Sequence, residues 1–366
     1  MSDNTLAVIP ADTGEALSDP GPEVIVDPND RDELRHLYRA GTILAVIGVV
    51  ALALALAPLF LTGARVLILL AGFVMLYMGV RRIGLARFGS GFDLTFILSC
   101  TWLALLTVTA LLAPLLPFGE HEDTAKTLTS PSYATPNLFS EYPLGTNNFG
   151  LDMLARSVYG ARYSLVVAVS AVLIGMIVGG TIGVIAGYYG GKIDRLAGVL
   201  TNSLLAVPSL ILLIALASVL EPNLRNVSLA LAVLAVPSMA RIARANTLVF
   251  SQREFVLAAR AMGATKGRVM LREITPNVVL PLASMGMVLI SAMIVAEASL
   301  SFLGLGIQPP TPTWGNMISE GQGTVFEQHP HIVLVPGLFL FLTVFSFNLI
   351  GEKAQKRTGG SREVKL

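Results

Sequence analysis

Residues 254–277 read EFVLAARAMGATKGRVMLREITPN and form a charged island in an otherwise apolar chain. Four of them recur at the spacing of one helix face: Phe255, Ala258, Ala259 and Met262. A helix through these positions would present a stripe of apolar and small side chains, with Arg260 turned away from it. Gly263 follows at once, and glycine readily adopts the left-handed conformation that ends many helices. The pattern predicts an exposed helix that ends at Gly263.

A second short helix is expected after Gly263. Thr265 is a residue type that favours helix N-caps, and the basic residues of 266–272 would follow it. Pro276 and Pro281 stand close to the point where a long apolar run resumes, as prolines do near helix starts. The stretch therefore reads as a helix–turn–helix in a loop between two apolar segments.

The composition of the whole chain sets its class. Among 366 residues, 54% are hydrophobic and 13% are charged, and the mean hydropathy is +0.70. Soluble domains carry about 25% charged residues, so we expect an all-α, polytopic membrane protein. A net charge of +1 does not indicate binding of nucleic acid or of acidic substrates. The single cysteine, Cys100, excludes an intramolecular disulfide.

Eight apolar runs are candidates for membrane-spanning helices, because about 20 residues cross a bilayer core. They are residues 41–61, 66–80, 93–116, 165–186, 197–220, 228–250, 278–300 and 332–350. The second run is short, but Arg81 and Arg82 at its end can extend to the headgroups. The polar segment 117–156 must lie outside the bilayer.

Basic residues alternate between loops in a way that predicts orientation. Arginines and lysines precede the first run, separate the second from the third and the fourth from the fifth, and follow the eighth. Seven more lie from Arg241 to Arg272, at the end of the sixth run and before the seventh, whereas residues 301–331 contain none. Cytoplasmic loops carry the excess of Lys and Arg. With eight spans, both termini and the 254–277 loop are then cytoplasmic.

Two features inside the apolar runs stand out. Glycines recur at every fourth position of the fourth run: Gly175, Gly179, Gly183 and Gly187. Small residues at this spacing allow two membrane helices to approach closely, although glycine is also simply common in such helices. Glu297 is an ionisable residue within the seventh run, which makes it a candidate for the translocation pathway, weakened by its position near the helix end.

The residues then resemble a known family. The pattern Glu254-Phe-Val-x-Ala258-Ala259-Arg260-Ala261-x-Gly263-Ala264, followed by Arg272-x-Ile274-x-Pro276-Asn277, is similar to the coupling loop of importer-type ABC permeases. More narrowly, it resembles the dipeptide/oligopeptide/nickel permeases, in the subgroup of the second (C-type) permease subunit. Three further segments resemble landmarks of this family: 144–165, 187–194 and 297–315. The resemblance covers roughly residues 93–351.

This resemblance implies a type I-like transmembrane domain of an ABC importer in the bacterial inner membrane. In the family, the loop docks into a groove of an ATPase subunit, which assigns the coupling role to Glu254, Phe255, Ala258, Ala259, Arg260, Met262, Gly263 and Pro276. It also implies a second permease subunit, two ATPase subunits or domains that bind ATP and Mg, and an extracytoplasmic binding protein that delivers short peptides. No cofactor is then expected on this chain. Nickel or another small solute is the alternative substrate.

The chain departs from the family pattern at several positions. Leu257 stands where the broader pattern has glutamate, and Thr275 stands where leucine usually precedes the proline. Asn147 and Asn202 replace aspartates, and Leu151 replaces a frequent arginine. These departures put any role of the missing charges in doubt.

The sequence divides into four parts. Residues 1–40 combine an acidic tail with a basic cytoplasmic lead-in; the first thirty hold seven acidic residues, four prolines and no Lys or Arg, a composition typical of disorder. Residues 41–92 hold two additional N-terminal spans whose purpose is not readable. Residues 93–350 form a six-helix permease core with the coupling loop at 251–277, and 351–366 form a cytoplasmic tail.

Other classes of function fit less well. A phosphate-binding loop needs Gly-x4-Gly-Lys-Ser/Thr, and the nearest approach, at Gly191-Lys192, lacks its decisive residues. Nothing resembles a catalytic triad or zinc cluster; Glu327-x-His329-x-His331 is more simply a set of solvated polar groups than a metal site. A secondary transporter would need more intramembrane ionisable residues than Glu297. A structural anchor would not need the helix pair, and an amphipathic helix on the membrane surface is the alternative interpretation of the loop.

Overall fold

The computed structural model describes residues 31–56, 62–89, 91–137 and 139–360. In this part of the chain the secondary structure is helical, and pairing between extended segments is limited to one isolated bridge, Thr146 with Asp152. The all-α prediction is confirmed. The acidic segment 1–30 lies outside the described residues. The chain forms two compact units, Met1–Leu94 and Thr95–Leu366.

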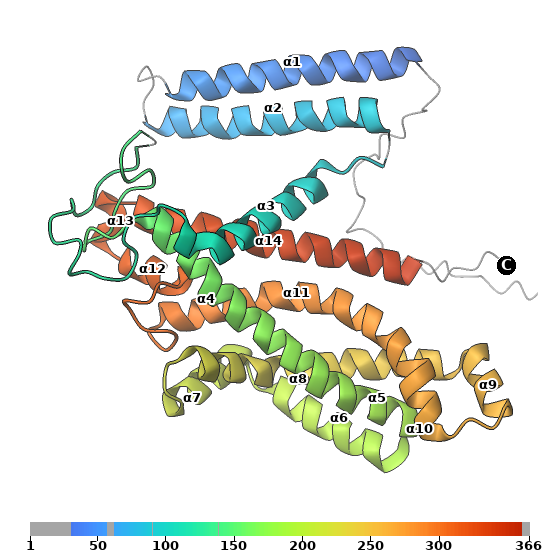
Figure 1. The fold of residues 1–366 in the computed structure, drawn as a ribbon. Helices are drawn as coiled ribbons and strands as arrows, with labels where there is room; N and C mark the ends of the chain where they lie inside the picture. Colours follow the sequence, from blue (N-terminus) through green and yellow to red (C-terminus); the bar gives the residue numbers. More distant parts are fainter. Residues whose placement is uncertain (1–30, 57–61, 90, 138, 361–366) are drawn as a thin grey trace, which may run out of the picture. The chain divides into compact units, whose positions relative to one another are not determined.

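The first unit is a hairpin of α1 (Arg31–Leu56) and α2 (Thr62–Phe88), which lie side by side (Figure 1). Glycines let the two backbones approach: a Cβ on Gly48 would meet the backbone of Leu76, and one on Gly79 would meet Ala45. The basic lead-in is not a separate segment, because it forms the first turns of α1. At 27 residues, α2 is far longer than the expected run of 66–80.

The second unit contains the remaining helices (Figure 1). They are α3 (Leu94–Leu112), a 3-10 turn (Ala113–Leu115), α4 (Met153–Ile174), a π segment (Gly175–Gly179), α5 (Gly180–Tyr189), α6 (Gly191–Ala206), α7 (Ser209–Val219), α8 (Leu224–Ser251), α9 (Glu254–Ala261), α10 (Lys266–Arg268), a second π segment (Val269–Ile274), α11 (Thr275–Phe302), α12 (Trp314–Glu320), α13 (Thr324–Gln328) and α14 (His331–Gly360).

By length and composition, seven of the described helices can cross a membrane, or eight if α6 and α7 form one bent span. The expected run over residues 197–220 is divided between α6 and α7, which meet at an angle of 88°. Pro208 explains the break. A proline disfavours the helical conformation of the residue before it, and Val207 is extended, with ψ of 129°.

Two other expected boundaries move. The fourth run belongs to a longer helix that continues from Met153 through the first π segment to Tyr189. The last helix does not end at residue 350, because α14 continues to Gly360, so most of the predicted tail is helical. Pro237 and Pro281 lie inside α8 and α11, respectively.

The core of the second unit is built around α8. Twelve of its residues are buried, among them Leu231, Ala235 and Met239, and the helix packs against α4, α5, α6 and α11. By contrast, α6 has no buried residue and α7 has only Leu213. Because α8 leads directly into the 254–277 stretch, the packing of α8 in the core holds that stretch in place.

Candidate functional site

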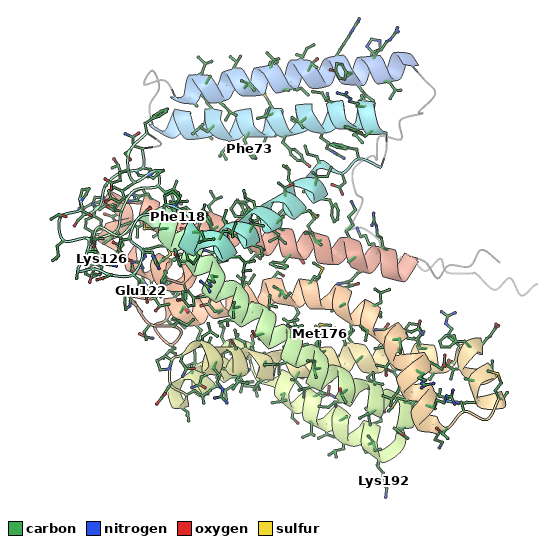
Figure 2. The ribbon with its side chains drawn as sticks, viewed as in Figure 1. Phe73, Phe118, Glu122, Lys126, Met176 and Lys192 are labelled. Atoms are coloured by element: carbon green, nitrogen blue, oxygen red, sulfur yellow. The ribbon has the colours of Figure 1, made fainter. Side chains whose placement is uncertain are left out.

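The 254–277 loop forms one end of the second unit, where α9 and α10 lie in Figure 1. The segment 117–152 lies at the opposite end, as the labels of Glu122, Lys126 and Lys192 indicate in Figure 2, with Lys192 at the start of α6. The charged loop and the long polar segment are therefore on opposite sides of the helices that can span a membrane. This separation is the one that the alternation of basic residues predicts.

The first helix of the loop, α9, ends as the sequence predicts. Gly263 has φ of +84°, and its N–H donates to the Arg260 carbonyl at 3.0 Å. The N–H of Ala264 donates to the Ala259 carbonyl, also at 3.0 Å. Together these bonds make a Schellman motif, in which a glycine turns the chain sharply out of the helix. A Cβ at Gly263 meets no neighbour, so only the backbone conformation calls for glycine here.

The helix α9 has a buried face and an exposed one. Val256 and Ala259 are 0% and 7% exposed and belong to the main core cluster. Phe255 and Met262 are 39% and 82% exposed, and Ala258 is exposed beside them. The prediction that Ala259 lies on the exposed stripe is therefore wrong. Ala259 lies at the edge of that stripe and packs into the core together with Val256. The exposed face of α9 therefore consists of Phe255, Ala258 and Met262.

The second predicted helix is not a separate element. The helix that starts at Lys266 continues without a break to Phe302, because a π segment carries it past Pro276, which lies in the first turn of α11. The Thr275 N–H and hydroxyl both bond to the Met270 carbonyl, five residues earlier. Thr265 occupies the N-cap position without a side-chain hydrogen bond.

The loop is held by contacts on both sides of the turn. Val269 and Ile274 are fully buried and join Val256 in the main core cluster. The Arg260 guanidinium lies over the ring of Tyr188, 5.4 Å from its centre, which connects α9 to the end of α5. Such a contact between a cation and an aromatic face is worth about 0.5–1 kcal/mol at an exposed site. These contacts with the core and with α5 hold α9 in place, so its exposed apolar face has a defined position.

The glycine stripe of the fourth run faces α8. A Cβ on Gly175 would contact Ala235, and one on Gly179, Gly183 or Gly187 would meet the backbone oxygen of a residue further along α8. The helix 153–189 and α8 therefore touch backbone to backbone over about three turns. Since α8 leads into α9, this contact also fixes where the loop begins.

Replacing one of these glycines should destabilise the chain. We expect Gly183→Ile to lower the unfolding free energy by at least about 1–3 kcal/mol, the usual cost of overpacking. The matched control is Gly198→Ile on α6, where a Cβ meets nothing within 4 Å. The measurement is the thermal unfolding temperature of the two purified variants in detergent. Equal temperatures would contradict close packing at Gly183.

Glu297 is fully buried at the far end of α11. Ser164 of α4 donates to one of its carboxylate oxygens at 2.8 Å, and Ser301 donates to the other at 2.7 Å. Both oxygens thus accept hydrogen bonds within the chain, and the carboxylate ties α11 to α4. A role in the translocation pathway stays a prediction.

The polar end of the unit contains a charged pair that sequence reasoning missed. Arg156 of α4 is 1% exposed, and its guanidinium donates to Glu320, the last residue of α12. The second Glu320 oxygen accepts from the Asn147 side chain at 3.1 Å. The asparagine that departs from the family pattern thus supplies a donor where an aspartate would place a second carboxylate. Arg156 and Glu320 are 164 positions apart in the chain, so no pattern of neighbouring residues could have predicted that they pair.

The histidines of the Glu327-x-His329-x-His331 pattern have packing roles. The ring of His329 stacks on Tyr133 with centres 4.3 Å apart, and the Nε2 of His331 lies 3.2 Å from the Thr146 carbonyl oxygen. Among the described residues, no group of three or more His, Cys, Asp or Glu side chains is arranged to hold a metal ion.

Burial shifts two pKa values at the same end. The carboxylate of Asp152 caps α4 by accepting from the Leu154 N–H at 2.9 Å, and its partial burial raises its pKa. His121 stacks on Tyr159 with ring centres 3.5 Å apart, and burial lowers its pKa despite the neighbouring Glu120 and Glu122. The segment 117–152 is therefore packed onto the helices.

Comparison with known proteins supplies independent information. Residues 179–359 match the family described as "Binding-protein-dependent transport system inner membrane component". The dipeptide transport system permease protein DppC of Alkalihalophilus pseudofirmus is 38% identical over 243 residues, 66% of this chain and 78% of that protein. DppC of Haemophilus influenzae is 37% identical over 69% of this chain and 85% of its own length. The glutathione transport system permease protein GsiD of Pectobacterium atrosepticum is 39% identical over 58% of this chain and 70% of its own.

Proposed function

The chain belongs to the family of binding-protein-dependent transport system inner membrane components, the permeases of ABC importers, and from this premise we propose that it is the C-type permease subunit of an ATP-driven importer of short peptides. It pairs with a second permease subunit, and ATP is bound and hydrolysed on two ATPase subunits or domains. An extracytoplasmic binding protein delivers the peptide. The membrane is the bacterial inner membrane.

The observation that carries the coupling role is the outer face of α9. This face consists of exposed residues at the end of the second unit: Phe255, Ala258 and Met262. On the other face of the same helix, Val256 and Ala259 pack into the core. An apolar face on a rigid support, outside the bilayer, is suited to dock into a groove of another protein. An amphipathic helix lying on the membrane would not need an inward face packed into the core.

The proposed substrate class follows from the relatives, whose names refer to dipeptides and glutathione. Glutathione is itself a short peptide, so both names point to one class. The test is uptake by proteoliposomes that contain the assembled transporter and its binding protein, with a dipeptide, glutathione and Ni²⁺ offered separately. We expect ATP-dependent uptake of one or both peptides and none of nickel. Uptake of nickel alone would overturn the substrate class.

The proposed topology has eight spans, with α6 and α7 together counted as one, and both termini in the cytoplasm. In a Cys100→Ser background, single cysteines at Thr62 and Ser319 should react with an impermeant thiol reagent applied to intact cells. Cysteines at Gly91, which is exposed and has open space for a Cβ, and at Gly360 should react only after permeabilisation, because basic residues mark those ends as cytoplasmic. If Thr62 and Gly91 react from the same side, α2 does not span and the proposed topology fails.

A further inference from the structure

The first unit carries a site that the transport function does not explain. The helices α1 and α2 precede the residues matched to the permease family, which begin at 179. Their exposed side chains are largely apolar along most of their length; Phe73, labelled in Figure 2, is 66% exposed. Basic residues gather at one end of the hairpin, where α1 begins and α2 ends.

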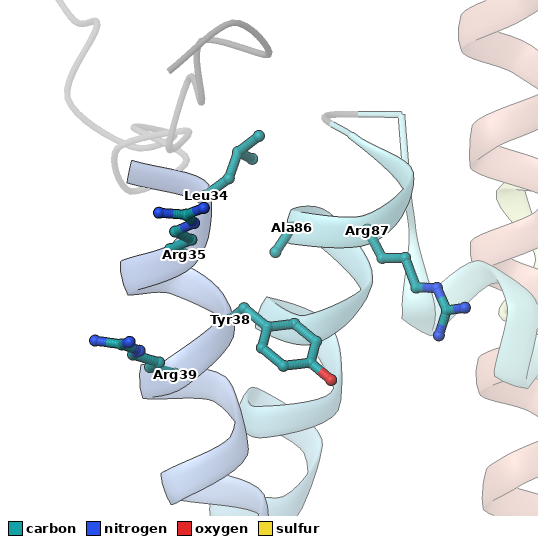
Figure 3. A pocket seen from close by; sticks show the side chains of 6 residues that line it. All are labelled: Leu34, Arg35, Tyr38, Arg39, Ala86 and Arg87. Atoms are coloured by element: carbon teal, nitrogen blue, oxygen red, sulfur yellow. The ribbon is translucent and has the colours of Figure 1, made fainter. Parts of the chain in front are cut away.

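A pocket lies at this basic end, between the two helices. It is lined by Leu34, Arg35, Tyr38, Arg39, Ala86 and Arg87 (Figure 3). Leu34, Ala86 and the ring of Tyr38 supply its apolar surface, and three arginines stand at its margins. Figure 3 shows Arg35 and Arg39 one turn apart on the side of α1 that faces away from α2, and the Arg87 side chain extends from α2 away from α1. An apolar hollow with cations at its margin complements a molecule that has both hydrocarbon and negative charge.

The net charge at this end is positive. Residues 31–39 and 81–93 contain six arginines and three acidic residues, Asp32, Glu33 and Asp93. The last turns of α2 itself carry Arg81, Arg82 and Arg87 and no acidic residue. Arginine guanidinium groups suit phosphate because they offer several N–H donors in a planar fork.

Aromatic rings place this end at the level of the lipid headgroups. Tyr38 and Phe88 are 46% and 70% exposed. The chain turns back after α2 through Gly89, with φ of +81°, and the ring of Phe92 then stacks on Phe88 with centres 5.5 Å apart. Aromatic side chains together with arginines are typical of the zone where hydrocarbon meets headgroups.

We propose that the pocket between α1 and α2 binds the phosphate headgroup of an anionic membrane phospholipid, with Tyr38 against the upper part of the lipid. The cationic partners are Arg39 and Arg87, whose side chains are exposed and turn toward the headgroup when it binds. Basic pockets between membrane helices on the cytoplasmic side are suited to anionic headgroups. The acyl chains then lie along the apolar surface of the hairpin. The two added helices thereby act as a lipid-recognition element of the subunit.

The test is lipid binding by the purified full-length chain in mild detergent. Fluorescent phosphatidylglycerol is titrated against phosphatidylcholine with the same acyl chains, and binding is measured by anisotropy. We expect tighter binding of phosphatidylglycerol. One arginine near an anionic surface contributes roughly fivefold in affinity, so Arg39→Gln with Arg87→Gln should weaken binding about 30-fold. The double variant with Lys at both positions should retain most of the affinity.

Controls separate this site from general charge and from other occupants. Lys192→Gln with Lys356→Gln removes the same charge outside the hairpin, and phosphatidylglycerol affinity should not change. The proposal is overturned if this control loses as much affinity for phosphatidylglycerol as the Arg39→Gln/Arg87→Gln variant, or if that variant loses none. Inorganic phosphate at millimolar concentration should not displace the lipid; full displacement would make this a free-anion site. If lipid binds only after deletion of residues 2–30, the acidic segment is the occupant and the proposal fails.

Discussion

In the assembled transporter, Met262→Glu is expected to abolish recovery of the ATPase subunits and to stop peptide uptake. Met262 is 82% exposed at the end of α9, on the face that it shares with Phe255 and Ala258. If this face enters an ATPase groove, the new carboxylate is buried without a partner, which costs several kcal/mol. Since each 1.4 kcal/mol is a factor of ten, docking should weaken by at least about 100-fold.

The matched control is Leu257→Glu. Leu257 is 55% exposed on the opposite side of α9, and glutamate is what the broader family pattern has at this position, so recovery of the ATPases should stay close to normal. Ala259→Glu is not a suitable probe, because Ala259 packs inward and the variant would disturb the loop itself. The measurements are co-purification of the ATPases and peptide-stimulated ATP hydrolysis. Normal values in Met262→Glu would remove the coupling role from this face.

Glu320→Ala is expected to destabilise the chain strongly. Arg156 would remain almost fully buried, and its partner carboxylate would be gone. Removing one member of a buried ion pair costs about 3–5 kcal/mol. The measurement is thermal unfolding in detergent, with Glu221→Ala at an exposed site as the control.

The double variant Arg156→Met/Glu320→Leu tests the reason for that loss. If the cost comes from an uncompensated buried charge, replacing both partners by apolar residues should restore part of the stability. If instead Glu320→Ala unfolds at the same temperature as Glu221→Ala, the pair does not stabilise the polar end of the unit.

The sequence predicts the features that depend on local spacing. The glycine at the end of α9 and the four glycines in register each follow from a rule that acts over a few residues, and the structure has the corresponding Schellman motif and backbone contact with α8. The helical class follows from composition alone.

Features that depend on distant contacts were not predictable in this way. Ala259 lies on the border of two helix faces, and only the packing of Val256 against the core decides its direction. The run 197–220 predicts a membrane span but not the 88° angle between α6 and α7, because Pro208 alone does not distinguish a kink from a break. The pairing of Arg156 with Glu320 requires the folded chain.

The helix from Lys266 to Phe302 joins the loop to the far end of the second unit. Its 37 residues follow a path of about 55 Å, from the loop to the turns around Glu297. The path includes a π segment (Val269–Ile274) and Pro281, and helices usually bend at such features. Work done on the loop would therefore reach the other end partly as movement of the whole helix and partly as bending at these two places.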